Sequence, residues 1–169
     1  NLPEDVSVRA VCAVPAGFDP RRWARKRWYR YTIANGEARE PLTRRGAWFV
    51  EGNLDVRAMQ AAAQALAGKK DFSAFSGPLE PERTPVRTVF TAGWRCEGST
   101  LLFDIEADAF LPQMVRRITG SLIRVGRGAE TVEEIVRLLQ QAEPGSMAYV
   151  APAHGLCLQR VWYDEGYTV

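Results

Sequence analysis

The sequence predicts an α+β fold, in which an antiparallel sheet has helices packed on one face. Three observations indicate this. Segments with alternating apolar residues are interspersed with segments of helical periodicity, and two alternating segments are joined by a short turn at Glu97-Gly98. A chain of 169 residues with 46% hydrophobic and 25% charged residues has the size and composition of one globular domain, which excludes a wholly disordered or fibrous protein.

Strands are expected first along the chain. Val6 to Val14 alternates, with apolar side chains at every second position, and predicts a strand. Trp28 to Ile33 is aromatic and β-branched and predicts a second strand. The apolar run Trp48-Phe49-Val50 follows a polar loop.

A helix is expected next, from Val56, with Asp55 as its cap and Gly68 placed to end it. The capping box Thr131-Val132-Glu133-Glu134 predicts the start of a later helix, which runs to about Gln141. The other elements expected in the second half are a strand pair over Val86 to Cys96 and Ser99 to Asp108, a helix over Phe110 to Val125 with Pro112 in its first turn, and a final strand over Leu156 to Tyr163.

Basic residues are concentrated near the N-terminus. Residues 1–50 hold ten Lys/Arg against five Asp/Glu, and between positions 21 and 30 six of ten residues are cationic and three are aromatic. Because cations neutralise phosphates and aromatic faces stack on bases, this segment is a candidate nucleic-acid-binding surface. The alternative is a solvated basic face with its aromatic residues folded inward. The candidate RNA-binding residues are Arg21, Arg22, Arg25, Lys26, Arg27 and Arg30.

The residue counts argue against a metal or disulfide framework. Cys12, Cys96 and Cys157 stand singly, and His154 is the only histidine, so no zinc site is expected. No apolar stretch is long enough to span a membrane, and the first residues lack the pattern of a signal peptide. We therefore expect a protein of the reducing cytoplasm that has no metal and no membrane partner.

Two charged groups leave alternatives open. Asp104, Glu106 and Asp108 fall on one face of the predicted strand, and they form either a solvated stripe or a metal site without histidine. Arg116 and Arg117 lie within an apolar helical stretch, so one of them must point nearer to the buried face. They either reach water along the edge of that face or hold an anion in a cleft.

Several segments that occur in order resemble one family, the TruA-type tRNA pseudouridine synthases, from the first residue to about Tyr163. The Arg-x-Tyr-x-Tyr and Phe-Leu-x-x-Met-Val-Arg patterns are moderately specific alone, and their joint order and spacing make a strong match. The matching segments are Asn1-Leu2-Pro3, Arg27 to Tyr31, Asp71 to Phe75, Thr84 to Val89, Ala109 to Arg116 and Ala151 to Leu156.

The resemblance implies a ferredoxin-like half of a pseudouridine synthase fold. It implies an enzyme that isomerises uridine to pseudouridine at positions 38 to 40 of the tRNA anticodon stem-loop, without metal or cofactor and usually as a homodimer. In such enzymes an aspartate nucleophile attacks a flipped nucleotide, a tyrosine stacks on its base and an arginine pairs with the aspartate. By motif position, Tyr29 is implied as the stacking tyrosine and Arg116 as the active-site arginine.

The family's Gly-Arg-Thr-Asp motif, which carries the nucleophile, does not occur in these 169 residues. We therefore expect residues 1–169 to be the C-terminal domain of such an enzyme, without the N-terminal domain, and the isolated chain to be inactive. Smaller departures are Trp23, where the family commonly has Ser, and Pro112, where His or Tyr is common. A weak match of Arg45 to Gly52 to an RNA-recognition octamer sustains the alternative of a stand-alone RNA-binding module without catalysis.

Overall fold

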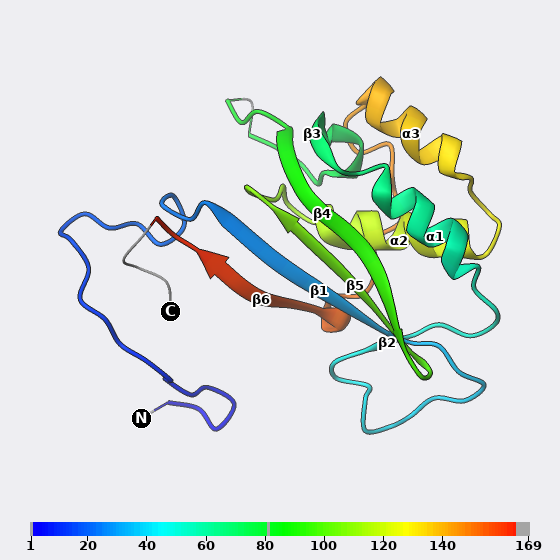
Figure 1. Cartoon of the computed structure of the whole chain (residues 1–169), viewed down its shortest axis with the longest axis horizontal. Helices are drawn as coiled ribbons and strands as arrows, with labels where there is room; N and C mark the ends of the chain where they lie inside the picture. The colour runs from blue at the N-terminus through cyan, green and yellow to red at the C-terminus, as the bar shows by residue number, and fades with distance from the viewer. Residues whose placement is uncertain (1, 81, 165–169) are drawn as a thin grey trace.

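The computed structural model describes residues 2–80 and 82–164, and it shows an α+β fold with one sheet and one layer of helices (Figure 1). Within these residues the sheet has six strands, in the order β2-β1-β5-β4-β3, with β6 also paired to β1. The strands are β1 (Lys26–Ala34), β2 (Trp48–Phe49), β3 (Gly68–Asp71), β4 (Val86–Glu97), β5 (Thr100–Ala107) and β6 (Leu156–Trp162). The helices are α1 (Val56–Gln64), α2 (Met114–Gly126) and α3 (Val132–Gln141), with short 3-10 helices η1 (Ser73–Phe75) and η2 (Ala153–Gly155).

Strand β1 has neighbours on both sides. It pairs with β5 in antiparallel register from Arg27 opposite Ala107 to Ala34 opposite Thr100. On its other side it pairs with β6 along its first part and with β2 at its end. The predicted fold class is confirmed, with one difference: the two-residue strand β2 runs parallel to β1, so the sheet is mixed rather than purely antiparallel.

Local signals placed most helix and turn boundaries correctly. The carboxylate of Asp55 accepts a hydrogen bond from the Ala58 N–H and begins α1. At the start of α3, Thr131 and Glu134 form both hydrogen bonds of the predicted capping box. The β4–β5 hairpin turns at Gly98, whose φ of 60° lies in the left-handed region that glycine adopts without strain.

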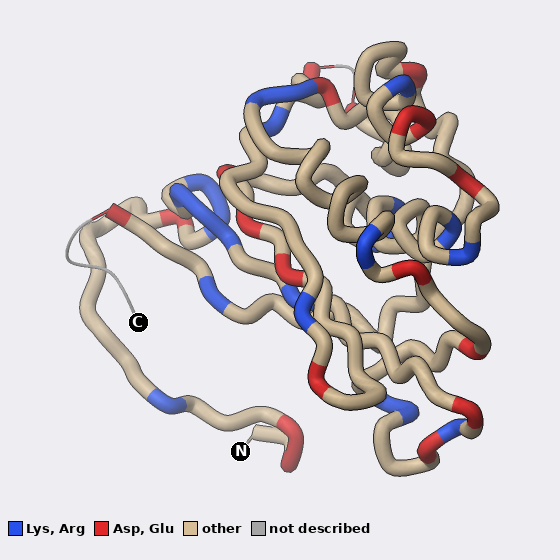
Figure 2. The backbone as a smooth tube through the Cα atoms, turned by 45° about the vertical axis from the view of Figure 1, so that its right-hand side comes forward, with Lys and Arg blue, Asp and Glu red and all other residues tan. Residues whose placement is uncertain are grey.

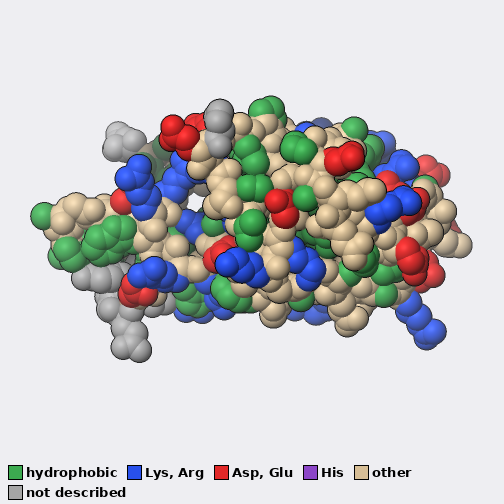
Figure 3. All heavy atoms as spheres, turned by 90° about the horizontal axis from the view of Figure 1, so that it is seen from above, with side chains coloured by type: hydrophobic (Ala, Val, Ile, Leu, Met, Phe, Trp, Pro, Cys, Tyr) green, Lys and Arg blue, Asp and Glu red, His purple; other side chains and the backbone are tan. Residues whose placement is uncertain are grey.

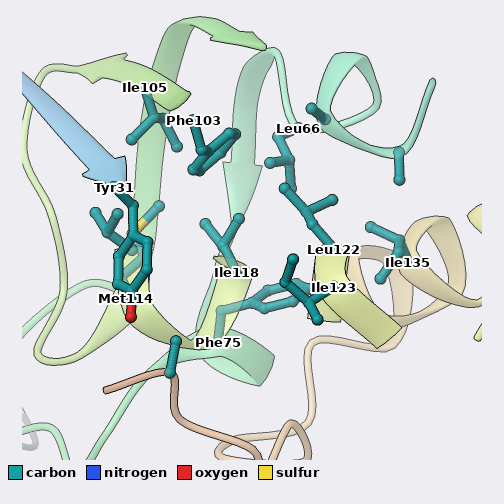
Figure 4. Packing of buried hydrophobic residues seen from close by; sticks show 14 of the residues in the cluster. Tyr31, Leu66, Phe75, Phe103, Ile105, Met114, Ile118, Leu122, Ile123 and Ile135 are labelled. Carbon is teal, nitrogen blue, oxygen red and sulfur yellow. The ribbon is translucent and has the colours of Figure 1, made fainter. Parts of the chain in front are cut away.

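The core lies between the sheet and the helices, where side chains from both layers interlock (Figure 4). Tyr31 and Phe103 point down from the sheet, while Ile118 and Leu122 point up from α2. All four side chains have at most 1% of their surface exposed. Ile118 and Leu122 are four positions apart in the sequence, so they belong to one apolar stripe of the helix, and this stripe packs on the sheet.

The strand predicted over Val6 to Val14 is wrong. These residues form no regular structure, and Val8 and Val11 expose 62% and 88% of their surface. In Figure 1 the segment runs away from the sheet as an extended loop. Alternation alone does not hold a strand, because a strand needs a neighbour to accept and donate its backbone hydrogen bonds.

Two predicted boundaries also need correction. Gly68, with φ of 97°, opens β3 instead of ending α1, which stops at Gln64. The helix predicted from Phe110 begins only at Met114, after a left-handed Gln113 with φ of 59°. Pro112 disfavours helical backbone at the residue before it, so it lies ahead of the helix and not in its first turn.

Candidate functional site

The alternation of strand β1 sends its residues to two different faces of the sheet. Tyr31 is fully buried under the helices. By the two-residue period, Arg27 and Tyr29 lie on that same face, and Lys26 and Arg30 lie on the other. The basic segment predicted from the sequence is therefore divided into two groups with different surroundings. Figure 2 shows basic residues gathered at the start of β1 and in the loop before it.

The cations on the open face of the sheet are already paired with carboxylates. The Lys26 Nζ donates to Glu106 at 2.7 Å, and Arg30 binds Asp104 through two nitrogens, at 2.9 and 3.0 Å. This ion pair raises the pKa of Arg30. Arg25, in the loop before the strand, pairs with Asp164 at 2.7 Å.

The carboxylate stripe of β5 is thus explained by its neighbours on β1. Asp104 and Glu106 balance the cations of that strand, while an oxygen of Asp108 accepts hydrogen bonds from the Thr88 and Ala109 N–H groups. Within residues 2–80 and 82–164 there is no group of three side chains suited to hold a metal ion. Neither alternative from the sequence describes the stripe fully, because its members are ion-paired and bonded to backbone instead of simply solvated.

The other face carries a cavity of about 750 Å³ at the end of the molecule where β1 begins. Tyr29 lies in its lining beside Phe110, with ring centroids 5.1 Å apart and planes at 88°. In the view from above, basic side chains gather around a hollow at this end (Figure 3). The lining residues are Asp19, Arg21, Arg22, Arg27, Tyr29, Glu80, Arg83, Arg87, Ala109 and Phe110. Five arginines and two carboxylates give this lining a positive charge.

The loop that carries Arg21 and Arg22 is held by Asp19. One oxygen of that carboxylate accepts the N–H groups of Arg21 and Arg22 at 2.8 and 3.0 Å. These bonds hold the pKa of Asp19 below its usual range, so this acid stays ionised near neutral pH. Its charge lies 3.6 Å from the Arg22 guanidinium, which leaves Arg21 as the unpaired cation of the loop among the described residues.

Arg27 lines the cavity from the strand itself. Its guanidinium donates to backbone carbonyl oxygens, among them that of Asp108 at 2.6 Å and that of Arg21. Because carbonyls carry no net charge, these bonds fix the side chain without neutralising it. Of the six predicted RNA-binding residues, the structure therefore brings Arg21, Arg22 and Arg27 to the cavity and places Arg25, Lys26 and Arg30 outside its lining.

Arg116 lies in the first turn of α2 and holds the segment before β6. Its Nε donates to the Ala151 carbonyl at 2.6 Å, and its own carbonyl accepts the Ala151 N–H at 3.2 Å. The Tyr31 hydroxyl donates to the next carbonyl, that of Pro152, at 2.6 Å. Burial raises the pKa of this tyrosine, and the nearby charge of Arg116 opposes the rise. Arg116 is half-buried, is not in the lining of the Tyr29 cavity, and forms no ion pair within the described residues.

Arg117, the second arginine of the pair, also binds a backbone carbonyl. Its guanidinium donates to the Met147 carbonyl and to the Gln113 side chain. Both arginines thus bind backbone carbonyls in the stretch from 147 to 151 instead of simply reaching water. The sequence alternatives did not include this role, which joins α2 to the chain that leads into β6.

Sequence reasoning did not identify Arg87 as a site residue. Arg87 lies on β4, on the same inward face as Val89, and only 9% of its surface is exposed. The sequence did contain a signal for this burial. Residues two apart in a strand lie on the same face, so an arginine two positions before an apolar valine indicates an arginine on the inward face.

No helix in the described part of the chain is long and apolar enough to cross a membrane. A sequence model of the family described as tRNA pseudouridine synthase matches residues 62–164. The chain is also similar to curated proteins named tRNA pseudouridine synthase A. It is 42% identical over 165 residues to that of Citrifermentans bemidjiense, covering 97% of this chain and 66% of the relative. For Geobacter sp. strain M21 the identity is 41%, covering 97% and 67%, and for Myxococcus xanthus it is 38%, covering 98% and 63%.

Proposed function

The chain belongs to the tRNA pseudouridine synthase family, and we propose that it is part of an enzyme that isomerises uridine to pseudouridine in tRNA. It spans about 66% of the length of the Citrifermentans relative. We propose that residues 1–169 are the C-terminal domain of this enzyme and that the nucleophilic aspartate is contributed by an N-terminal domain. The proposed substrate is the anticodon stem-loop, with uridines 38 to 40 as targets.

One observation carries the proposal: the cavity that presents Tyr29 together with several arginines. The isomerisation breaks the bond between C1′ and N1 of uridine and forms one between C1′ and C5, so the base must leave the helix and be turned. A flipped base needs a stacking platform, which contributes roughly 1–3 kcal/mol per base. Tyr29 offers such a ring, held edge-on by Phe110, and the surrounding arginines provide positive charge for the RNA backbone.

We assign Arg116 the role of pairing with the nucleophilic carboxylate. A half-buried guanidinium favours the ionised form of a carboxylate beside it, which is the reactive form. Arg116 suits this role because its Nε is fixed on the Ala151 carbonyl, while no acid of the described chain takes up its charge. Asp19 does not suit the role of nucleophile, because its carboxylate is bound to the N–H groups of its own loop.

The test measures pseudouridine formation in the complete enzyme, with RNA binding measured in parallel. We expect Arg116→Ala to lower kcat by at least 100-fold, in line with the loss of an electrostatic partner in a buried site, and to change RNA affinity less than threefold. Tyr29→Ala should lower both kcat and RNA affinity, whereas Tyr29→Phe should keep the RNA affinity because the ring remains. Arg124→Ala is a control on the same helix, with an exposed arginine paired to Glu130.

The second candidate is an RNA-binding module without catalysis. The observation that favours it is that Arg116 lies outside the lining of the cavity that contains Tyr29. For such a module, Arg116→Ala would leave every measured property near wild type or change binding alone. Pseudouridine formation by the isolated 169 residues would instead refute the assignment of the nucleophile to another domain.

We further propose that the complete enzyme is a cytoplasmic homodimer. The support is the family membership and the reducing conditions that suit three exposed free cysteines, Cys12, Cys96 and Cys157. Light scattering of the complete enzyme at micromolar concentration tests this, with a monomer mass as the contrary result.

A further inference from the structure

Arg87 is a buried cation that forms no ion pair among the described residues. Only 9% of its surface is exposed, and its Nε is buried with no hydrogen-bond partner among the described residues. One Nη donates to the carbonyls of Thr84 and Val86, at 2.8 and 2.5 Å. Guanidinium remains charged at any physiological pH, so burying it without an anion costs free energy.

Two neighbouring cations add to this cost. Burial is the main cause that lowers the pKa of Arg87, and the positive charges of Arg83 and Arg27 lower it further, so each of them lies close enough to repel Arg87. The charge of Asp108 opposes these effects and outweighs either arginine alone, but this carboxylate forms no ion pair with Arg87, and one of its oxygens is bound to backbone N–H groups. None of the three arginines forms an ion pair in the part of the chain that the structure describes. Such a cluster is typical of a site completed by an anion.

The cluster opens to the cavity of Tyr29. Arg27, Arg83 and Arg87 all belong to its lining, together with Tyr29 and Phe110. A volume of about 750 Å³ lies in the range of pockets that hold small organic ligands. Aromatic rings and unpaired arginines in one cavity match the two halves of a nucleotide, which carries a flat base and a phosphate.

We propose that Arg87, with Arg27 and Arg83, binds a backbone phosphate of the RNA beside the nucleotide that stacks on Tyr29. The inference rests on the proposed function and adds to it a phosphate site in which Arg87 is the inner residue. A phosphodiester is favoured over a protein carboxylate because the aromatic pair lies in the same cavity. The guanidinium of Arg87 then gains a hydrogen-bonded anion, which no described residue provides.

The experiment measures the affinity of the complete enzyme for an anticodon stem-loop RNA over a range of salt concentrations. Arg87→Met removes the charge and keeps most of the apolar stem, Arg87→Lys keeps the charge, and Arg57→Met is the matched control on α1, outside the cavity. For Arg87→Met we expect a loss of roughly 10-fold or more in affinity. The slope of log affinity against log salt should fall in magnitude by about 0.7–0.9, which corresponds to one phosphate. Arg87→Lys should restore the slope, and Arg57→Met should leave affinity and slope near wild type.

A second arm locates the phosphate. We would measure how tightly the wild type and Arg87→Met bind a set of stem-loops. In each stem-loop a single phosphate is replaced by an uncharged methylphosphonate. We expect one position at which the replacement weakens wild-type binding roughly 10-fold and leaves Arg87→Met unchanged. Thermal unfolding should show Arg87→Met at least as stable as the wild type, because the variant loses an unpaired buried charge.

The outcomes separate the two proposals. Loss of pseudouridine formation by Arg87→Met, with an unchanged salt slope and no sensitive phosphate, would overturn the phosphate site and indicate a protein carboxylate as the partner. Wild-type behaviour of Arg87→Met in both arms would also overturn it, while the proposed function stands. If the wild type itself neither binds nor modifies the stem-loop, the proposed function fails and this inference fails with it. Should Arg87→Met not fold, Arg87→Gln in the methylphosphonate arm provides the same comparison.

Discussion

Gly155 packs directly against Tyr31 in η2, which follows the residues that Arg116 binds. Its replacement by alanine tests this packing. A Cβ at this position would lie 2.6 and 2.7 Å from two ring carbons of Tyr31 and 2.9 Å from the Thr32 carbonyl oxygen. Real Cβ atoms do not tolerate such distances. Tyr31 cannot move away, because its ring is fully buried and its hydroxyl is bonded to the Pro152 carbonyl at 2.6 Å.

The magnitude follows from these contacts. Forcing a methyl group into a packed core costs about 1–3 kcal/mol. Displacing η2 also weakens the hydrogen bond between Tyr31 and Pro152, which contributes about 1 kcal/mol. We therefore expect Gly155→Ala to lower the free energy of unfolding by about 2–4 kcal/mol. Since Ala151 and Pro152 precede η2 directly, pseudouridine formation by the complete enzyme should fall as well, through the displacement of Arg116.

Urea unfolding at 25 °C, followed by circular dichroism, measures this change. The matched control is Gly46→Ala, since a Cβ at Gly46 would meet nothing within 4 Å and its backbone has no positive φ. This control should stay within about 0.5 kcal/mol of the wild type. If Gly155→Ala unfolds at the same urea concentration as Gly46→Ala, the close packing of η2 on Tyr31 is wrong, and so is the reasoning built on it.

Three further predictions follow from single contacts. Thr131→Ala removes the side chain that caps α3 and should cost about 1 kcal/mol in urea unfolding; an unchanged midpoint would contradict the cap. Burial raises the folded-state pKa of Tyr31 above its unfolded value near 10, so its stabilisation is complete below about pH 10 and is lost as the pH rises further. The stability of Tyr31→Phe should therefore fall less steeply above pH 10 than that of the wild type, and parallel curves would exclude this cause. Arg21→Ala should lower the salt slope of RNA binding more than Lys26→Ala does, because the Lys26 ammonium already binds a carboxylate at 2.7 Å; equal slopes would refute the division of the basic segment.

The elements that the sequence predicted well are those set by neighbouring residues. The capping box at Thr131 and the turn at Gly98 depend on a few positions along the chain, and both lie where the pattern predicts them. The periodic apolar stripe that includes Ile118 and Leu122 also predicts its own buried face, because helical spacing alone places those side chains together.

Features that depend on distant partners were predicted less well. The alternation of Val6 to Val14 is as regular as that of a strand, yet no neighbour pairs with it in the described structure. Strand β3 was missed because Gly68 to Asp71 has little strand character of its own and pairs with the edge of β4. Whether such segments become strands is decided by the availability of a hydrogen-bonding neighbour, which lies far away in the sequence.

The site shows the same division. From the sequence alone came the family resemblance, the basic and aromatic segment, and the identities of Tyr29 and Arg116 as candidates. Only the tertiary structure decided which cations are free, because Lys26 and Arg30 meet carboxylates 80 and 74 positions later in the chain, whereas Arg27 meets only carbonyls among the described residues. Charge along a sequence is additive, but the energy of each charge depends on what the fold places within a few ångströms of it.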